Sequence, residues 1–365
     1  MSYRYSTKNN HIVYADLLRI FAAFSVIINH IPRFQSEIAS FNWQIDNIFY
    51  SIVSFDVSVF IMLSGMFNLR SDNLNDSEYG KFFKKSLKMA VALVFWSVLY
   101  NILPLCKIIL KGESMASLDL MSIPAKILSC EPRTHLWYLY LIIGLYLFTP
   151  LLKLFVKNAS KKDFEYWLLL YATLGLGINF YNTIGAKLNE LCNYLPSIIY
   201  FPFLELSGYL GYYIAGYYFS KYTLSRNVKI FIYIMALISL FITIIGTSIM
   251  SSSAGKLSLE LYNFTQSKPT TMFISFAVFI VFKDIFEQRN FTSKQQNIIK
   301  HFAGCTFGIY LLHWLILGRF NAIGLNYNIF NPLFSIPLLA LLVMFTSYLV
   351  TLILQRIPKF NGYVV

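Results

Sequence analysis

Long apolar stretches separated by short polar or basic segments fill the sequence. A helix needs roughly 20 apolar residues to cross the hydrocarbon core of a bilayer. The pattern predicts ten membrane-spanning helices, at approximately residues 13–31, 48–69, 87–106, 136–156, 164–181, 197–219, 228–250, 270–286, 302–318 and 333–354. Because no segment between these spans reaches the size of a soluble domain, we expect residues 1–365 to form a single membrane domain with no appended soluble domain. The predicted fold class is therefore an all-α bundle embedded in a membrane.

The composition and the placement of charge support this interpretation. Hydrophobic residues make up 57% of the 365 positions and charged residues only 13%, which excludes an ordinary water-soluble domain. The formal charge of +13 comes from basic residues between the spans, so it indicates membrane topology rather than nucleic-acid binding. Alternating the spans leaves 20 of the 30 Lys and Arg residues on the side of the two termini and nine on the other side. We therefore expect both termini in the cytoplasm.

The first span contains both a cation and an imidazole. Arg19 and His30 are eleven residues apart, which places their side chains on one helical face about 16 Å apart along the axis. A guanidinium at membrane depth costs at least a few kcal/mol, so we expect Arg19 to face a polar cavity inside the protein. Asp16, one turn earlier, offers the alternative that a local ion pair neutralises the arginine. These two charges, with no small-residue cleavage pattern after the span, argue against a cleaved secretory signal.

Two carboxylates lie at positions from which they can support His30. Asp56 lies in the outer half of the second span, at a depth comparable with His30. A carboxylate there can orient an imidazole and raise its basicity, so Asp56 joins Arg19 and His30 in the predicted catalytic set. Glu205, in the sixth span, is a second candidate and is assigned to the predicted substrate-binding set.

Two further histidines lie toward the same predicted outer face. His135 begins the fourth span, and His313 lies in the outer half of the ninth. An ionisable residue within a membrane span is a functional hypothesis by default, so both are predicted substrate-binding residues. The alternative for each is a hydrogen bond that only stabilises a helix end.

A lysine cluster precedes the third span and consists of Lys81, Lys84, Lys85 and Lys88. These lysines can anchor the helix or bind anionic lipid. They can also hold the phosphates of a cytoplasmic donor. The sequence leaves both interpretations open.

The cysteines and histidines do not indicate a metal site. No two of them stand at ligand spacing, so we expect no metal. Three of the four cysteines fall near the predicted outer face, where one disulfide can form in an oxidising compartment, although free thiols are the favoured interpretation; the cysteines are Cys106, Cys130, Cys192 and Cys305.

Four stretches of the chain carry a family pattern. They are RIFAAFSVIINH at 19–30, FIMLSG at 60–65 followed by FFKKSLK at 82–88, HLWYLYLIIGLYLFTPLL at 135–152, and FGIYLLHWLI at 307–316. In this order, and with ten predicted spans, they resemble the acyltransferase-3 family of bacterial integral membrane acyltransferases. The lysines of FFKKSLK depart from the family pattern, in which arginines are usual, and lysine cannot make a planar two-point contact to phosphate.

The resemblance implies an O-acyltransferase of the bacterial cytoplasmic membrane that modifies an envelope polysaccharide or glycolipid, commonly with an acetyl group from cytoplasmic acetyl-CoA. It makes Arg19 and His30 the arginine and the essential histidine of the family motif. It also places Lys84, Lys85 and Lys88 in the basic segment expected to bind the donor, together with Arg19. His30 then acts either as a general base on the acceptor hydroxyl or as a nucleophile that carries the acyl group.

Two other classes of function are compatible with the sequence. A secondary transporter would use Arg19 and His30 to bind an envelope glycan or small solute without covalent chemistry, and it would need no acyl donor. A membrane sensor or assembly partner would retain the fold without catalysis.

Overall fold

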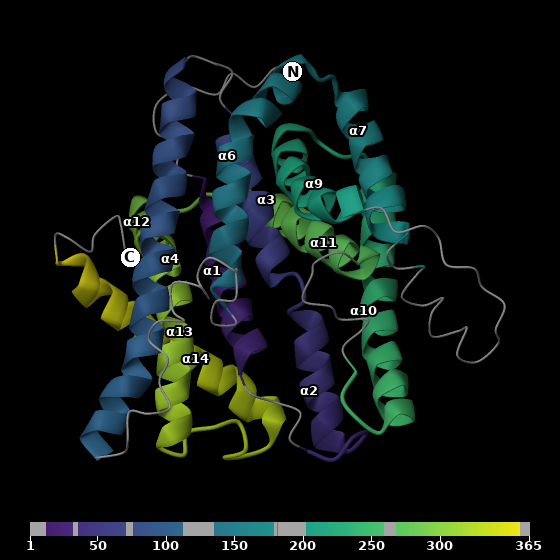
Figure 1. Cartoon of the computed structure of the whole chain (residues 1–365). Coiled ribbons are helices and arrows are strands. Elements are labelled where there is room, and N and C mark those ends of the chain that lie inside the picture. The colour runs from purple at the N-terminus through teal and green to yellow at the C-terminus, as the bar shows by residue number, and fades with distance from the viewer. Residues whose placement is uncertain are drawn as a thin grey trace.

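The chain folds as a bundle of helices (Figure 1). This computed structural model describes residues 12–31, 36–70, 76–111, 135–178, 181, 202–258 and 268–357, without the side chains of 76–77, 104–111 and 202–207. Every regular element in these ranges is a helix, which confirms the predicted all-α class. The helices are α1 (Val13–His30), α2 (Phe41–Ile52), α3 (Asp56–Asn68), α4 (Asp76–Lys111), α6 (Trp137–Asn158), α7 (Lys161–Leu170), the π-helical η2 (Tyr171–Gly177), α9 (Pro202–Lys221), α10 (Arg226–Ala254), α11 (Pro269–Phe286), α12 (Ser293–Gly304), α13 (Thr306–Ala322) and α14 (Pro332–Gln355).

Several of these helices are long and apolar enough to cross a membrane. In the described part of the chain there are seven such segments: α1, α2 with α3, α4, α6, α10, α11 and α14. The pair α12 and α13 is bent by 52° and adds an eighth if it counts as one span. The spans predicted at 164–181 and 197–219 correspond to α7 with η2 and to α9, which are not among the seven. The chain is thus a multi-pass membrane protein, while the count of ten spans and the cytoplasmic termini stay predictions.

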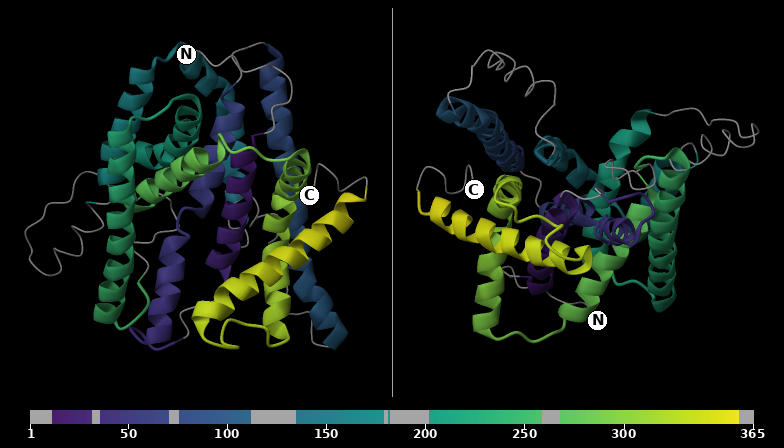
Figure 2. Two further views of the ribbon diagram at one scale, coloured as in Figure 1. Left: turned by 180° about the vertical axis from the view of Figure 1, so that it is seen from behind. Right: turned by 90° about the horizontal axis from the view of Figure 1, so that it is seen from below.

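Helix α1 lies in the middle of the bundle (Figures 1 and 2). It contacts α2, α3, α11, α12, α13 and α14. One apolar cluster, which includes Leu18 and Ala22, joins α1 to α3, α9 and α11. A second cluster, which includes Ile27, joins it to α4, α13 and α14. Because α1 is packed on both sides, the polar side chains that it carries are held at fixed positions.

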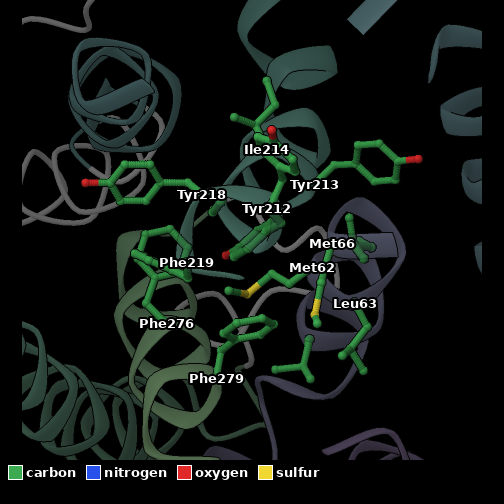
Figure 3. Packing of buried hydrophobic residues seen from close by; sticks show 14 of the residues in the cluster. Met62, Leu63, Met66, Tyr212, Tyr213, Ile214, Tyr218, Phe219, Phe276 and Phe279 are labelled. Carbon is green, nitrogen blue, oxygen red and sulfur yellow. The ribbon is translucent and has the colours of Figure 1, made fainter. Parts of the chain in front are cut away.

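Helices α3 and α9 cross in direct backbone contact. A Cβ atom on Gly65 of α3 would lie 1.8 Å from the carbonyl oxygen of Tyr213, and one on Gly216 of α9 would lie 1.9 Å from that of Met62. Small residues at such crossings let membrane helices approach closely. Met62 lies beside Tyr212 in this contact (Figure 3). The crossing fixes α3 against the rest of the bundle.

Contacts with α3 show where the C-terminal end of α1 lies along the segment formed by α2 and α3. Asn29, the residue before His30, donates from Nδ2 to Oδ2 of Asp56 at 2.9 Å, where α3 begins. Near the other end of α1, Cζ of Arg19 lies 5.4 Å from the ring centroid of Phe67, so α1 and α3 run antiparallel. The 12 residues of α2 therefore continue the span beyond α1 by about 18 Å. Along the apolar segment Phe41–Asn68, His30 therefore lies between the two ends rather than at one of them.

Candidate active site

Three histidines from distant parts of the sequence meet in one cluster. His30 ends α1, His135 precedes α6, and His313 lies in α13. The ring centroids of His30 and His313 are 5.0 Å apart, those of His135 and His313 are 5.3 Å apart, and those of His30 and His135 are 6.4 Å apart. His135 and His313 are buried, whereas His30 is half-buried. We call this group the histidine cluster.

Aromatic side chains surround the histidine cluster. The ring of Trp314 lies 5.5 Å from that of His30 and stacks on that of His135 at 5.7 Å. The hydroxyl of Tyr310 donates to the backbone carbonyl of His135, and the hydroxyl of Tyr100 donates to a backbone carbonyl of α13 at 2.7 Å. The sequence pattern gave no role to Tyr100 or Tyr310, although Tyr310 lies in the same FGIYLLHWLI stretch as the histidine of α13.

Backbone carbonyls orient two of the imidazoles. Nδ1 of His30 lies 2.8 Å from the carbonyl oxygen of Val26, and Nδ1 of His313 lies 2.5 Å from that of Tyr310. A carbonyl oxygen only accepts, so in each neutral ring Nδ1 carries the proton and Nε2 carries the lone pair. Nε2 is therefore the basic and nucleophilic atom of both rings.

A cavity of about 320 Å³ runs from Arg19 to Tyr310. Val26, whose carbonyl oxygen bonds His30, also lines this cavity. The rest of the wall is mostly apolar and comes from α3, α4, α6, α12 and α13, with Val57, Phe60, Met89, Ile142 and Phe307 among its residues. Arg19 therefore lines a cavity whose wall is mostly apolar, whereas the sequence predicts a polar one. Tyr310, which also lines the cavity, contacts His135 and His313 of the histidine cluster.

Arg19 also has an ion-pair partner. Its Nη1 lies 3.2 Å from Oδ1 of Asp16, one turn earlier on α1. The arginine side chain is 30% exposed and the aspartate side chain 11% exposed. Arg19 thus both lines the cavity and pairs with Asp16, and its role in catalysis and donor binding stays a prediction.

The lysines predicted to bind the donor differ in their surroundings. Nζ of Lys85 donates to Oδ1 of Asn68 at 2.6 Å and lies 5.8 Å from the ring centroid of Tyr146, which lines the cavity. Lys84 and Lys88 are exposed. The structure therefore places Lys85 next to Tyr146 of the cavity wall and leaves the other two at the surface of α4.

A buried ion pair next to Lys85 was not predicted. Lys153 of α6 is 2% exposed and pairs with Glu78 of α4, which also binds Lys81 at 3.1 Å. The Nζ atoms of Lys85 and Lys153 lie 5.0 and 5.2 Å from the ring centroid of Phe82, so the two ammonium groups are neighbours. One feature of the sequence could have predicted this ion pair. Lys153 lies inside an apolar span, in LFTPLLKLF, and a charged residue in a membrane span needs a partner.

The two candidate carboxylates are placed differently. Asp56 is buried, its Oδ2 accepts from Asn29, and its Oδ1 accepts from the backbone N–H of Val57 at 2.6 Å. Asp56 is thus anchored to the residue before His30, and a direct role on the imidazole stays a prediction. The side chain of Glu205 lies outside the described residues.

Cysteines and metal ligands add nothing further to the site. Among the described residues, no group of three or more His, Cys, Asp or Glu side chains is arranged to hold a metal ion. Cys305 is a buried free thiol. The side chains of the other cysteines, Cys106, Cys130 and Cys192, lie outside the described residues.

A family model matches the chain over almost its whole length. The acyltransferase-3 model, which describes an acyltransferase domain, matches residues 12–356. No curated protein and no solved structure matches the chain. The matched range contains Arg19, the histidine cluster and the lysines of α4.

Proposed function

Because the chain belongs to the acyltransferase-3 family, we propose that it is a membrane O-acyltransferase that moves an acyl group, most simply acetyl, from cytoplasmic acyl-CoA to a hydroxyl of an envelope polysaccharide or glycolipid. The observation that carries the proposal is the cavity between Arg19 and Tyr310, beside the histidine cluster. It supports a route by which a thioester from one side of the membrane meets an acceptor from the other side.

In this proposal the donor enters at the Arg19 end of the cavity. Lys85, beside the cavity wall at Tyr146, provides a point charge for the CoA phosphates. Arg19 then draws the carbonyl of the thioester inward, because a guanidinium presents several N–H donors in a fixed plane. The apolar wall suits the pantetheine arm and the acyl group, whose apolar atoms gain free energy on leaving water.

His30 carries out the chemical step. A sugar hydroxyl has a pKa too high for it to attack unaided. Nε2 of His30 removes the hydroxyl proton while the oxygen attacks the thioester carbonyl; the C–S bond breaks, and the departing CoA thiolate takes the proton from His30. In the alternative, Nε2 attacks the carbonyl and the C–S bond breaks, so that CoA leaves as the thiolate; the hydroxyl oxygen then takes the acyl group from the acylated imidazole, its proton goes to the thiolate, and His30 returns to the neutral state. Both routes use Nε2, because Nδ1 bonds the Val26 carbonyl.

The test is acyl transfer by the purified protein. Protein in lipid nanodiscs receives radiolabelled acetyl-CoA and a crude envelope glycan extract, and label in the glycan is counted. We expect His30→Ala to lower the transfer rate by about 10²- to 10⁴-fold, because it removes the base.

The matched control is His301→Ala, which removes an exposed histidine of α12. This variant should transfer label at the wild-type rate. No transfer by the wild type, or equal transfer by the His30 variant, contradicts the proposed function; solute uptake without CoA release would favour the transporter.

A further inference from the structure

One carboxylate lies among three lysines where α4 packs against α6. Oε1 of Glu78 lies 3.1 Å from Nζ of Lys81, and Oε2 accepts from Nζ of the buried Lys153. Glu78 and Lys85 lie on one face of α4, about two turns apart, and their charges interact. Each oxygen of Glu78 therefore already contacts a lysine other than Lys85, and the group as a whole carries an excess of positive charge.

Lys85 has no counter-ion in the described part of the chain. Its ammonium donates to the neutral amide of Asn68 at 2.6 Å and lies 5.0 and 5.8 Å from the ring centroids of Phe82 and Tyr146. No carboxylate among the described residues lies within ion-pair distance of it. An ammonium has three N–H donors, and the bond to Asn68 uses one of them. Because a cation in a membrane span is costly without a counter-charge, this site favours an anionic ligand.

We propose that Lys153 is a positioning residue: its ion pair with Glu78 keeps this carboxylate away from Lys85, so that the Lys85 ammonium can bind a phosphate group. The inference rests on the proposed function, in which that phosphate belongs to acyl-CoA. Lys153 is itself buried, so it acts on the donor through Glu78 rather than by contact.

Competition for Lys85 is the physical basis of this role. Packing alone does not require the ion pair, because apolar side chains in place of a buried pair are often no less stable. Without Lys153, one oxygen of Glu78 loses its partner, and Lys85 is a neighbouring ammonium that lacks a counter-ion. A carboxylate bound there competes with phosphate for the same cation. Loss of Lys153 should therefore weaken donor binding and leave the chemical step at His30 unchanged.

Two variants test this competition. Lys153→Met removes the charge but keeps an unbranched side chain, and Lys153→Met/Glu78→Gln also removes the competing carboxylate. Each protein in nanodiscs receives acetyl-CoA and the envelope glycan extract, and released CoA thiol is measured over a range of acetyl-CoA concentrations. We expect Lys153→Met to raise KM for acetyl-CoA about tenfold while kcat changes less than about threefold, because the phosphate loses a charge-assisted hydrogen bond. The double variant should return KM to within about threefold of wild type.

The matched control is Lys157→Met, which removes an exposed lysine of α6 one turn after Lys153. It takes away the same charge and should match the wild type. If size-exclusion chromatography shows that Lys153→Met does not fold, Lys153→His replaces it. An imidazolium at about pH 6 pairs with Glu78, whereas a neutral imidazole at about pH 8 does not. KM should then rise about tenfold more over this range than it does in the wild type, and a rise equal to that of the wild type overturns the proposal.

Three results with Lys153→Met overturn the role of Lys153. They are an unchanged KM, a raised KM that Glu78→Gln does not restore, and a rise no larger than that of Lys157→Met. A lipid headgroup is the other source of phosphate, so the assays use phosphatidylcholine nanodiscs with and without anionic phosphatidylglycerol. If Lys153→Met loses only a thermal stabilisation by phosphatidylglycerol, with KM unchanged, the phosphate belongs to a lipid. These results leave the proposed function standing, whereas no CoA release by the wild type overturns both.

Discussion

The electrostatics of Arg19 determine how much of its guanidinium is available for chemistry. Asp16 contacts it through one oxygen at 3.2 Å, and both side chains retain some exposure. A guanidinium has five N–H donors, so this pair uses a small part of its capacity. The pair also keeps the cation from standing alone in a membrane span, where it would be costly. At the residue scale, Asp16 is therefore best understood as holding Arg19 toward the cavity that Arg19 lines.

The first prediction separates the two members of this pair. We expect Arg19→Gln to lower kcat/KM for acetyl-CoA by about 100-fold, because it removes the cation that the proposed mechanism assigns to the thioester carbonyl. Asp16→Asn should lower it by less than about tenfold, since the amide oxygen still accepts from Arg19. The measurement is label transfer from acetyl-CoA in nanodiscs. If both variants lose the same activity, the ion pair itself, rather than the guanidinium, is what the reaction needs.

At the scale of helices, the features of the site that the sequence predicts are those set by the periodicity of one helix. The features that it does not predict depend on contacts between helices. Arg19 and His30 share a face of α1 because eleven residues make about three turns, and no other part of the chain is needed to see this. The meeting of His30 with His135 and His313 depends on where α6 and α13 pack, which no local pattern encodes. The contact between Glu78 and Lys153 also depends on packing, because Glu78 lies on α4 and Lys153 on α6.

The second prediction concerns the crossing of α3 and α9. Gly65→Ala should destabilise the protein by about 1–3 kcal/mol, because the added Cβ lies 1.8 Å from the Tyr213 carbonyl oxygen and the helices must move apart. Gly144→Ala in α6 is the matched control, since a Cβ there meets no atom within 4 Å. It should be neutral or slightly stabilising. Thermal unfolding in nanodiscs measures both, and equal shifts would contradict the close crossing.

For the whole molecule, the arrangement around α1 places the elements of the proposed reaction path next to one another. The helix carries Arg19 near one end and His30 at the other, and the cavity beside it is closed by α3, α4, α6, α12 and α13. Because α2 continues beyond His30, the proposed reaction would take place between the ends of the Phe41–Asn68 span. A site at that position would limit hydrolysis of a thioester, since water competes poorly with a bound acceptor there.

A third prediction tests whether the thioester passes through this cavity. Gly304 lines it at the bend between α12 and α13, whereas Gly318, further along α13, is not among the lining residues. Both glycines are exposed, and a Cβ at either position meets no atom within 4 Å. Both positions therefore accept a larger side chain without a helix clash. We expect Gly304→Phe to lower CoA release from acetyl-CoA by about tenfold or more, because small displacements of reacting groups cost up to 10²-fold. Gly318→Phe should match the wild type. Equal rates in the two variants would mean that the acyl group reaches the histidine cluster by a route outside this cavity. That result would contradict the proposed role of Arg19 in binding the thioester.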